Sequence, residues 1–160
     1  MTNETTQVAI IMGSDSDLPI VEAAFPILDS FGVTFTKNVM SAHRTPHDVM
    51  ELIKNSEQNG CKVFIAAAGM AAHLAGAVAA HSTKPVIGIP IESGGMGGID
   101  SLLSTAMMPP GVPVATVAVG KSGAKNSAIL AVQILATSND DLARKLKDYK
   151  ENMRAEVLEK

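Results

Sequence analysis

The sequence predicts an α/β fold, a three-layer sandwich built on a doubly wound parallel sheet. Five apolar runs alternate with segments of helical periodicity along 160 residues, which is the pattern of repeated βαβ units. The first, third and fifth runs are almost continuously apolar, as expected of strands that helices cover on both faces. The predicted strands are Val8–Met12, Val33–Val39, Val63–Ala68, Val86–Ile91 and Val114–Val119.

Helices are predicted between these strands. Apolar residues recur at helical spacing in Leu18–Leu28 and Val49–Ile53, and Gly32 and Gly60 stand where each helix should stop. Pro26 predicts a kink in the first helix or a shortened helix. Further helices are predicted at Ala71–His81, around Leu102–Ala106, and at Ala124–Ala136.

The length suits one domain, so we expect a single catalytic domain over residues 1–160, with a flexible N-terminus at residues 1–7. Residues 140–160 predict an amphipathic helix, whose apolar face can pack on its own domain or on a neighbouring subunit. The residues on that face are Leu142, Leu146, Tyr149, Met153 and Val157.

Composition excludes several classes of function. A net charge of −3 gives no reason to expect nucleic acid or an anionic membrane as a partner. The polar start lacks the order of a signal peptide, and the longest apolar run is interrupted by His73 and glycines. The single Cys61 cannot form an intrachain disulfide and suits a reducing cytosol, so we expect a cytoplasmic protein. The four histidines and one cysteine show no metal-ligand spacing.

In an open parallel sheet, ligands bind outside the carboxyl ends of the strands. The first strand is followed by Gly13–Asp17, in which Ser14 and Ser16 can hold an anion and Asp17 can accept hydrogen bonds from a ribose. The alternative is a simple helix cap, because Ser and Asp are common caps whatever the function.

The second strand is followed by Ser41–Asp48. Thr45, Pro46 and Asp48 are explained as helix initiation. Ser41, His43 and Arg44 are not explained in this way, and a histidine beside an arginine can combine proton transfer with an anion clamp. The alternative is a solvated turn.

Small residues and glycines follow the remaining strands. Ala66–Gly76 leaves space for a flat ring or for CO2, or else serves tight helix packing, with His73 as an ordinary core histidine. Glu92–Gly98, with four glycines, predicts a mobile flap. Gly120–Asn126 contains Gly-Lys-Ser but lacks the glycine spacing of a nucleoside-triphosphate loop and follows the last strand.

In combination these segments resemble the N5-carboxyaminoimidazole ribonucleotide mutase family of purine biosynthesis, over about residues 8–139. The matching pieces are Met12-Gly13-Ser14-x-Ser16-Asp17, Ser41-Ala42-His43-Arg44-Thr45-Pro46, Ala71-Ala72-His73-Leu74-x-Gly76, Asp100-Ser101-Leu102 before Met108-Pro109, Gly111–Val114 and Gly120–Asn126.

The resemblance implies a flavodoxin-like fold, a homo-octamer, no metal and no organic cofactor. It also implies a small ribonucleotide substrate bound through Ser14, Asp17 and Arg44, with Ser16 and Ser41 beside them. His43 would be the acid–base, and His73 would lie near the carboxylate or CO2. Two positions depart from the family: Ala75 replaces its usual proline and Leu18 its usual tryptophan, and we expect altered packing there.

Two other functions remain as alternatives. The nearest is the animal-type enzyme that carboxylates aminoimidazole ribonucleotide directly; that branch carries Lys in place of Arg44 and lacks the His73-Leu74 pair. The second is a non-catalytic flavodoxin-like nucleotide-binding module. A receiver of that kind needs acidic residues where this chain has Met12-Gly13 and Ala68-Gly69.

Overall fold

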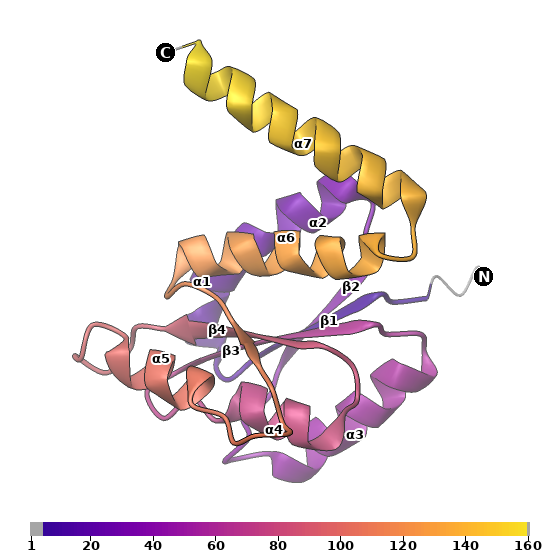
Figure 1. The fold of residues 1–160 in the computed structure, drawn as a ribbon. Helices are drawn as coiled ribbons and strands as arrows, with labels where there is room; N and C mark the ends of the chain where they lie inside the picture. Colours follow the sequence, from indigo (N-terminus) through magenta and orange to yellow (C-terminus); the bar gives the residue numbers. More distant parts are fainter. Residues whose placement is uncertain (1–4, 160) are drawn as a thin grey trace.

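Five parallel strands form one sheet in the order β2-β1-β3-β4-β5, and helices pack on both of its faces (Figure 1). The structure is a computed structural model that describes residues 5–159. This is the predicted three-layer sandwich, and the strand order is flavodoxin-like, with its switch point between β1 and β3. The strands are β1 (Val8–Met12), β2 (Phe35–Val39), β3 (Val63–Gly69), β4 (Val86–Ile91) and β5 (Ala115–Thr116).

The helices divide between the two faces of the sheet (Figure 1). One face carries α1 (Leu18–Val21), α2 (Phe25–Phe31) and α6 (Lys121–Ala136), with α7 (Asp140–Leu158) lying outside them. The other face carries α3 (Pro46–Gln58), α4 (Leu74–His81) and α5 (Ile99–Ala106). Two short 3-10 turns, Asp15–Asp17 and Glu22–Ala24, flank α1.

The core consists of two apolar clusters separated by the sheet. All five residues of β1 are buried; Val8, Ile10 and Met12 belong to the cluster under α2 and α6, and Ala9 and Ile11 to the cluster under α3 and α4. Full burial of a large aliphatic side chain such as Ile10 or Ile11 stabilises the fold by about 1.5–3 kcal/mol. The loops that leave the carboxyl end of β1 are therefore anchored on a rigid support.

The prediction for Pro26 is confirmed. The first helical segment is interrupted by the 3-10 turn Glu22–Ala24, and Pro26 lies in the first turn of α2. A proline is tolerated there because the first turn of a helix has no partner for the missing N–H.

The second strand begins at Phe35, two residues later than predicted, because Val33 belongs to the capping motif that follows α2. Gly32 has the left-handed φ of 73°, and the Val33 N–H donates to the Leu28 carbonyl at 3.0 Å. This is a Schellman motif, which satisfies the last carbonyls of the helix. The predicted stop at Gly32 is confirmed.

The fifth strand is shorter than predicted and is exposed at the sheet edge, so the expectation that helices cover both its faces is wrong. The regular pairing stops after Gly88↔Thr116, although Gly120 N still donates to the Pro90 carbonyl at 2.9 Å. Pro90 has no N–H to donate to β5, so the regular hydrogen bonding between β4 and β5 ends there. By contrast, all six residues of β4 are buried, as are those of β1.

The chain ends differ in how far the structure describes them. Residues 1–4 of the predicted flexible N-terminus lie outside the described part, whereas Gln7 N donates to the Thr34 carbonyl at 3.0 Å. The C-terminal helix runs over Asp140–Leu158, where Asn139 caps it by accepting from Leu142 N at 3.1 Å. Among residues 5–159, no helix combines the length and apolar character that a membrane span requires.

Candidate active site

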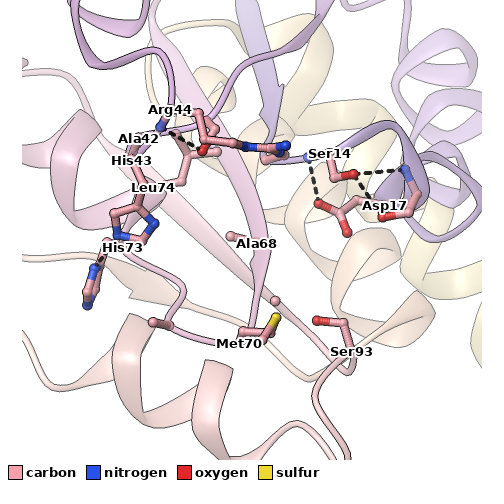
Figure 2. A pocket seen from close by; sticks show the side chains of 15 residues that line it. Ser14, Asp17, Ala42, His43, Arg44, Ala68, Met70, His73, Leu74 and Ser93 are labelled. Carbon is pink, nitrogen blue, oxygen red and sulfur yellow. Dashed lines mark hydrogen bonds between the residues drawn. The ribbon is translucent and has the colours of Figure 1, made fainter.

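A cavity of about 580 Å³ opens at the carboxyl ends of β1, β2 and β3, beside the switch point of the sheet. Figure 2 shows its walls, which come from the loops after β1, β2 and β3 and from Ser93 in the loop after β4. All seven residues predicted for the site line it: Ser14, Ser16, Asp17, Ser41, His43, Arg44 and His73.

The loop after β1 forms both a helix cap and a wall of the cavity. The Ser14 hydroxyl accepts from Ser16 N at 3.3 Å and lies 3.0 Å from the Ser16 hydroxyl. Asp17 Oδ2 accepts from Ser14 N at 3.1 Å, which completes a capping box. The cap alternative is thus correct as local structure, and it also presents two hydroxyls to the cavity.

Asp17 is the most deeply buried charged residue of this loop, with 5 % of its surface exposed. Burial raises the pKa of its carboxyl, and the hydrogen bond from the Ser14 backbone opposes that rise. An ionised Asp17 accepts hydrogen bonds only, which suits a ribose diol. Because the pKa is raised, Asp17 should become protonated at a higher pH than an ordinary aspartate as the pH falls. Its ability to accept these hydrogen bonds as a carboxylate should be lost at that point.

The loop after β2 is held by Ser41 and Thr45. The expectation that Thr45 caps α3 with its side chain is wrong, because Thr45 Oγ1 accepts from Ser41 N at 3.0 Å. The Ser41 hydroxyl in turn accepts from Arg44 N at 3.2 Å. Arg44 Nη2 then donates to the Gly13 carbonyl at 3.0 Å, which joins this loop to the one after β1.

His43 and His73 are directly hydrogen bonded. His43 Nε2 lies 2.7 Å from His73 Nδ1, and the rings meet edge to face with their centroids 4.8 Å apart. One ring must donate and the other accept, so the bond fixes complementary tautomers. His73 lies exposed at the start of α4, so the alternative of an ordinary core histidine is wrong.

Helix α4 begins at Leu74 rather than at the predicted Ala71. Ala71–His73 form a tight turn, in which His73 N donates to the Ala71 carbonyl at 2.8 Å. Of these three residues, Ala71 and His73 line the cavity, together with the small side chains Ala42 and Ala68. The space predicted from this run of small residues is therefore present.

Sequence reasoning did not single out Met70 and Ser93, which also line the cavity. A Cβ at Gly69 would overlap Ser93 Oγ, so glycine at that position lets the two segments touch. The signal for Met70 in the sequence was its position in Gly69-Met70, directly after a buried strand. The signal for Ser93 was its position in a Gly-rich segment.

Met70 has a φ of 54°, the left-handed region that glycine adopts readily. For a residue with a side chain this conformation costs roughly 1–2 kcal/mol. Strain of this kind commonly persists at functional sites because the surroundings enforce it.

Of the predicted flap Glu92–Gly98, Ser93 lies on the cavity. Gly95, Gly97 and Gly98 have φ values of 76°, 63° and 80°, so this segment uses backbone conformations that other residues rarely adopt.

The Gly-Lys-Ser segment lies elsewhere. Lys121 and Ser122 form the first turn of α6 and are not among the residues that line the cavity. A Cβ at Gly123 would overlap the Ala118 carbonyl, which gives this glycine a packing role. Within residues 5–159, no cluster of three or more His, Cys, Asp or Glu side chains could hold a metal ion.

The fold and the cavity define a flavodoxin-like α/β protein with a ligand pocket at the switch point of its sheet. A sequence model of the family described as AIR carboxylase matches residues 7–156. The chain belongs to this family.

Similar proteins span nearly the whole chain. The N5-carboxyaminoimidazole ribonucleotide mutase of Thermotoga maritima is 52 % identical over 154 residues, covering 96 % of this chain and 89 % of the relative. The protein of the same name from Bacillus subtilis is 51 % identical over 152 residues, covering 95 % and 94 %. The crystal structure of Treponema denticola PurE superposes with a TM-score of 0.87 at 30 % identity, covering 96 % and 94 %.

Replacement of Arg44 by lysine tests the anion clamp. Arg44→Lys keeps the charge but loses the planar fork that can bond Gly13 and a phosphate together. We expect the Kd of the product ribonucleotide, measured by calorimetry, to rise at least roughly tenfold, the equivalent of one charge-assisted hydrogen bond. Arg144→Lys on the surface of α7 is the matched control; an unchanged Kd for Arg44→Lys would place the phosphate elsewhere.

Proposed function

We propose that this chain is an isomerase of purine biosynthesis, which converts N5-carboxyaminoimidazole ribonucleotide to 4-carboxy-5-aminoimidazole ribonucleotide. The relatives at 51–52 % identity carry the mutase name. The observation that carries the mechanism is the joining of two groups in one cavity: hydroxyls beside an arginine, and a hydrogen-bonded histidine pair.

The first group suits the ribose phosphate. Ser14 and Ser16 offer hydroxyl donors, and Arg44 offers a bidentate cation. Asp17 is buried below them, where its carboxylate can accept from the ribose hydroxyls. With the phosphate bound here, the imidazole ring extends toward the histidine pair.

The second group suits the proton transfers. In the substrate, a carboxyl group is bonded to the exocyclic nitrogen. His43 donates a proton to that nitrogen, the C–N bond breaks, and CO2 is released. The electron-rich ring carbon attacks CO2, and its proton then returns to His43. The net proton change is zero, so one histidine can act as acid and then as base.

His73 extends this relay. Its Nδ1 shares a hydrogen bond with His43 Nε2 at 2.7 Å, so a proton added to or removed from His43 can be balanced through His73. Because His73 directly precedes α4, beside the small residues of the β3–α4 turn, it is also close to the space in which CO2 would be held.

Several observations weigh against the alternatives. A direct carboxylase is disfavoured by Arg44 and His73-Leu74, and by the mutase name of the relatives. A non-catalytic nucleotide-binding module is disfavoured by membership in an enzyme family over residues 7–156.

We also propose that the chain assembles as a homo-octamer in the cytoplasm. Two separate apolar surfaces are exposed. One consists of Ile99 and Leu103 on α5 with Met107 directly after it, and the other of Met153, Val157 and Leu158 on α7. Figure 1 shows α5 and α7 in opposite outer layers. A single isologous two-fold interface would cover one of these surfaces, so the burial of both surfaces requires an assembly larger than such a dimer.

The inner half of α7 packs on its own domain, where Phe31 and Tyr149 rings lie 5.7 Å apart. The outer half borders an apolar groove of about 700 Å³ between α6 and α7. The inner half of this helix therefore packs on its own domain, and we propose that the outer half lies between subunits.

His43→Asn tests the proton transfer. The variant should fold and bind the ribonucleotide, while kcat falls at least roughly 10²-fold, the usual contribution of general acid–base catalysis. His47→Asn, an exposed change on α3, is the control. Near-normal turnover of His43→Asn would remove this residue from the mechanism.

Isotope labelling tests the mutase assignment. Supplied with the carbamate substrate in labelled bicarbonate, the enzyme should form product with little label, because the carbon released from nitrogen is recaptured before it escapes. An enzyme-free control corrects for spontaneous loss of the carbamate. If label enters at the solution ratio and the carbamate is consumed no faster than in the control, the chain is a direct carboxylase.

Light scattering at micromolar concentration tests the assembly. We expect a mass about eight times 16.6 kDa, and a smaller mass for Leu103→Glu and for Val157→Glu, since each places a charge in one proposed interface. A monomeric wild-type chain would refute the proposal.

A further inference from the structure

Met70 adopts a left-handed backbone conformation, which costs free energy for a residue with a side chain but not for glycine. It is the one residue other than glycine with a positive φ among residues 5–159. It follows Gly69 at the end of β3 and precedes the turn that carries His73. The side chain is 59 % exposed, so burial in the core does not account for it.

The Met70 side chain joins the cavity to the flap. It lines the cavity, and its Cγ would lie 3.4 Å from a Cβ built at Gly94. On the same glycine, Asp100 Oδ2 would lie 2.9 Å from that Cβ. Gly94 therefore lies beside both Met70 and Asp100, and a larger residue there would require the Asp100 carboxylate to shift.

A second contact lies one residue away on each segment. Gly69 meets Ser93, because a Cβ at Gly69 would overlap Ser93 Oγ. Residues 69–70 and 93–94 thus form one continuous contact at the edge of the cavity. In the view of Figure 2, Met70 lies between His73 and Ser93.

The position of Met70 suits the retention of a small apolar molecule. CO2 is neutral and offers almost no group for specific binding, so it must be held by enclosure. A thioether side chain is apolar and has flexible torsions, so it can close a gap of irregular shape between the turn and the flap.

We propose that Met70 retains CO2 during the reaction: its side chain packs on Gly94 and closes the gap between the β3–α4 turn and the flap Glu92–Gly98. This inference rests on the proposed mutase function. Met70 takes no part in bond making, and its effect is on the fate of the intermediate.

Loss of this closure changes the products. When CO2 escapes after the C–N bond breaks, the exocyclic nitrogen keeps its new proton and the ring carbon keeps its hydrogen. The reaction then ends at aminoimidazole ribonucleotide plus CO2. Dissolved CO2 can also enter and be incorporated, so leakage is measurable in two independent ways.

The experiment compares wild type, Met70→Ala, Met70→Gly and Met70→Leu, with Met50→Ala on the surface of α3 as the matched control. Each enzyme receives the carbamate substrate in labelled bicarbonate. The measured quantities are the ratio of aminoimidazole ribonucleotide to product, the label in the product, and Tm.

For Met70→Ala and Met70→Gly we expect the leakage ratio and the label fraction to rise at least several-fold, while Met70→Leu and Met50→Ala stay near wild type. Met70→Gly should also have a higher Tm than Met70→Ala, because glycine relieves the left-handed strain. Leakage and stability thereby move independently, which a purely structural role would not produce.

Suppose that the wild type retains its carbon and that Met70→Gly shows the same leakage ratio and label fraction as the wild type. This result would overturn the proposal for Met70 and leave the mutase function intact. A wild type that itself incorporates label at the solution ratio would instead overturn the mutase function. If Met70→Ala fails to fold, the comparison of Met70→Gly with Met70→Leu carries the same test.

Discussion

The parallel register of β1 with both of its neighbours determines where each functional group lies. Met12, the last residue of β1, is paired with Val39 of β2 and with Ala67 of β3. Neighbouring strands are about 4.8 Å apart, so the three loops that leave these ends begin almost side by side. Burial of β1 on both faces keeps this arrangement rigid. Residues from three distant parts of the sequence must therefore share one cavity.

The loop after β2 connects the two halves of that cavity through adjacent residues. Arg44 bonds the Gly13 carbonyl of the β1 loop, and His43 bonds His73 of the β3–α4 turn. In the proposed function, Arg44 binds the phosphate and His43 transfers protons. These two roles therefore belong to adjacent residues of one loop. Movement of the loop would change both sites together, which explains why its backbone is tied by Ser41 and Thr45.

Hydrophobic runs and glycine stops predicted the sheet, its helices and the loops that line the cavity, because those features depend on local periodicity. Features that depend on a distant partner were not predictable in this way. The early end of β5 results from the missing N–H of Pro90 on another strand. Thr45 offered a cap by its spacing, yet its hydroxyl bonds Ser41. The left-handed Met70 and its contact with Gly94 require the relative placement of two loops.

A crystal structure of the chain with the product ribonucleotide bound would show whether one cavity holds the phosphate beside Arg44 and the reacting ring beside the histidine pair. We predict phosphate oxygens within hydrogen-bond distance of Ser14 and the Arg44 guanidinium, ribose hydroxyls at Asp17, and the new carboxylate facing His43 and His73. A product bound in the opposite direction, with its phosphate at the histidine pair, or bound outside this cavity would contradict the account.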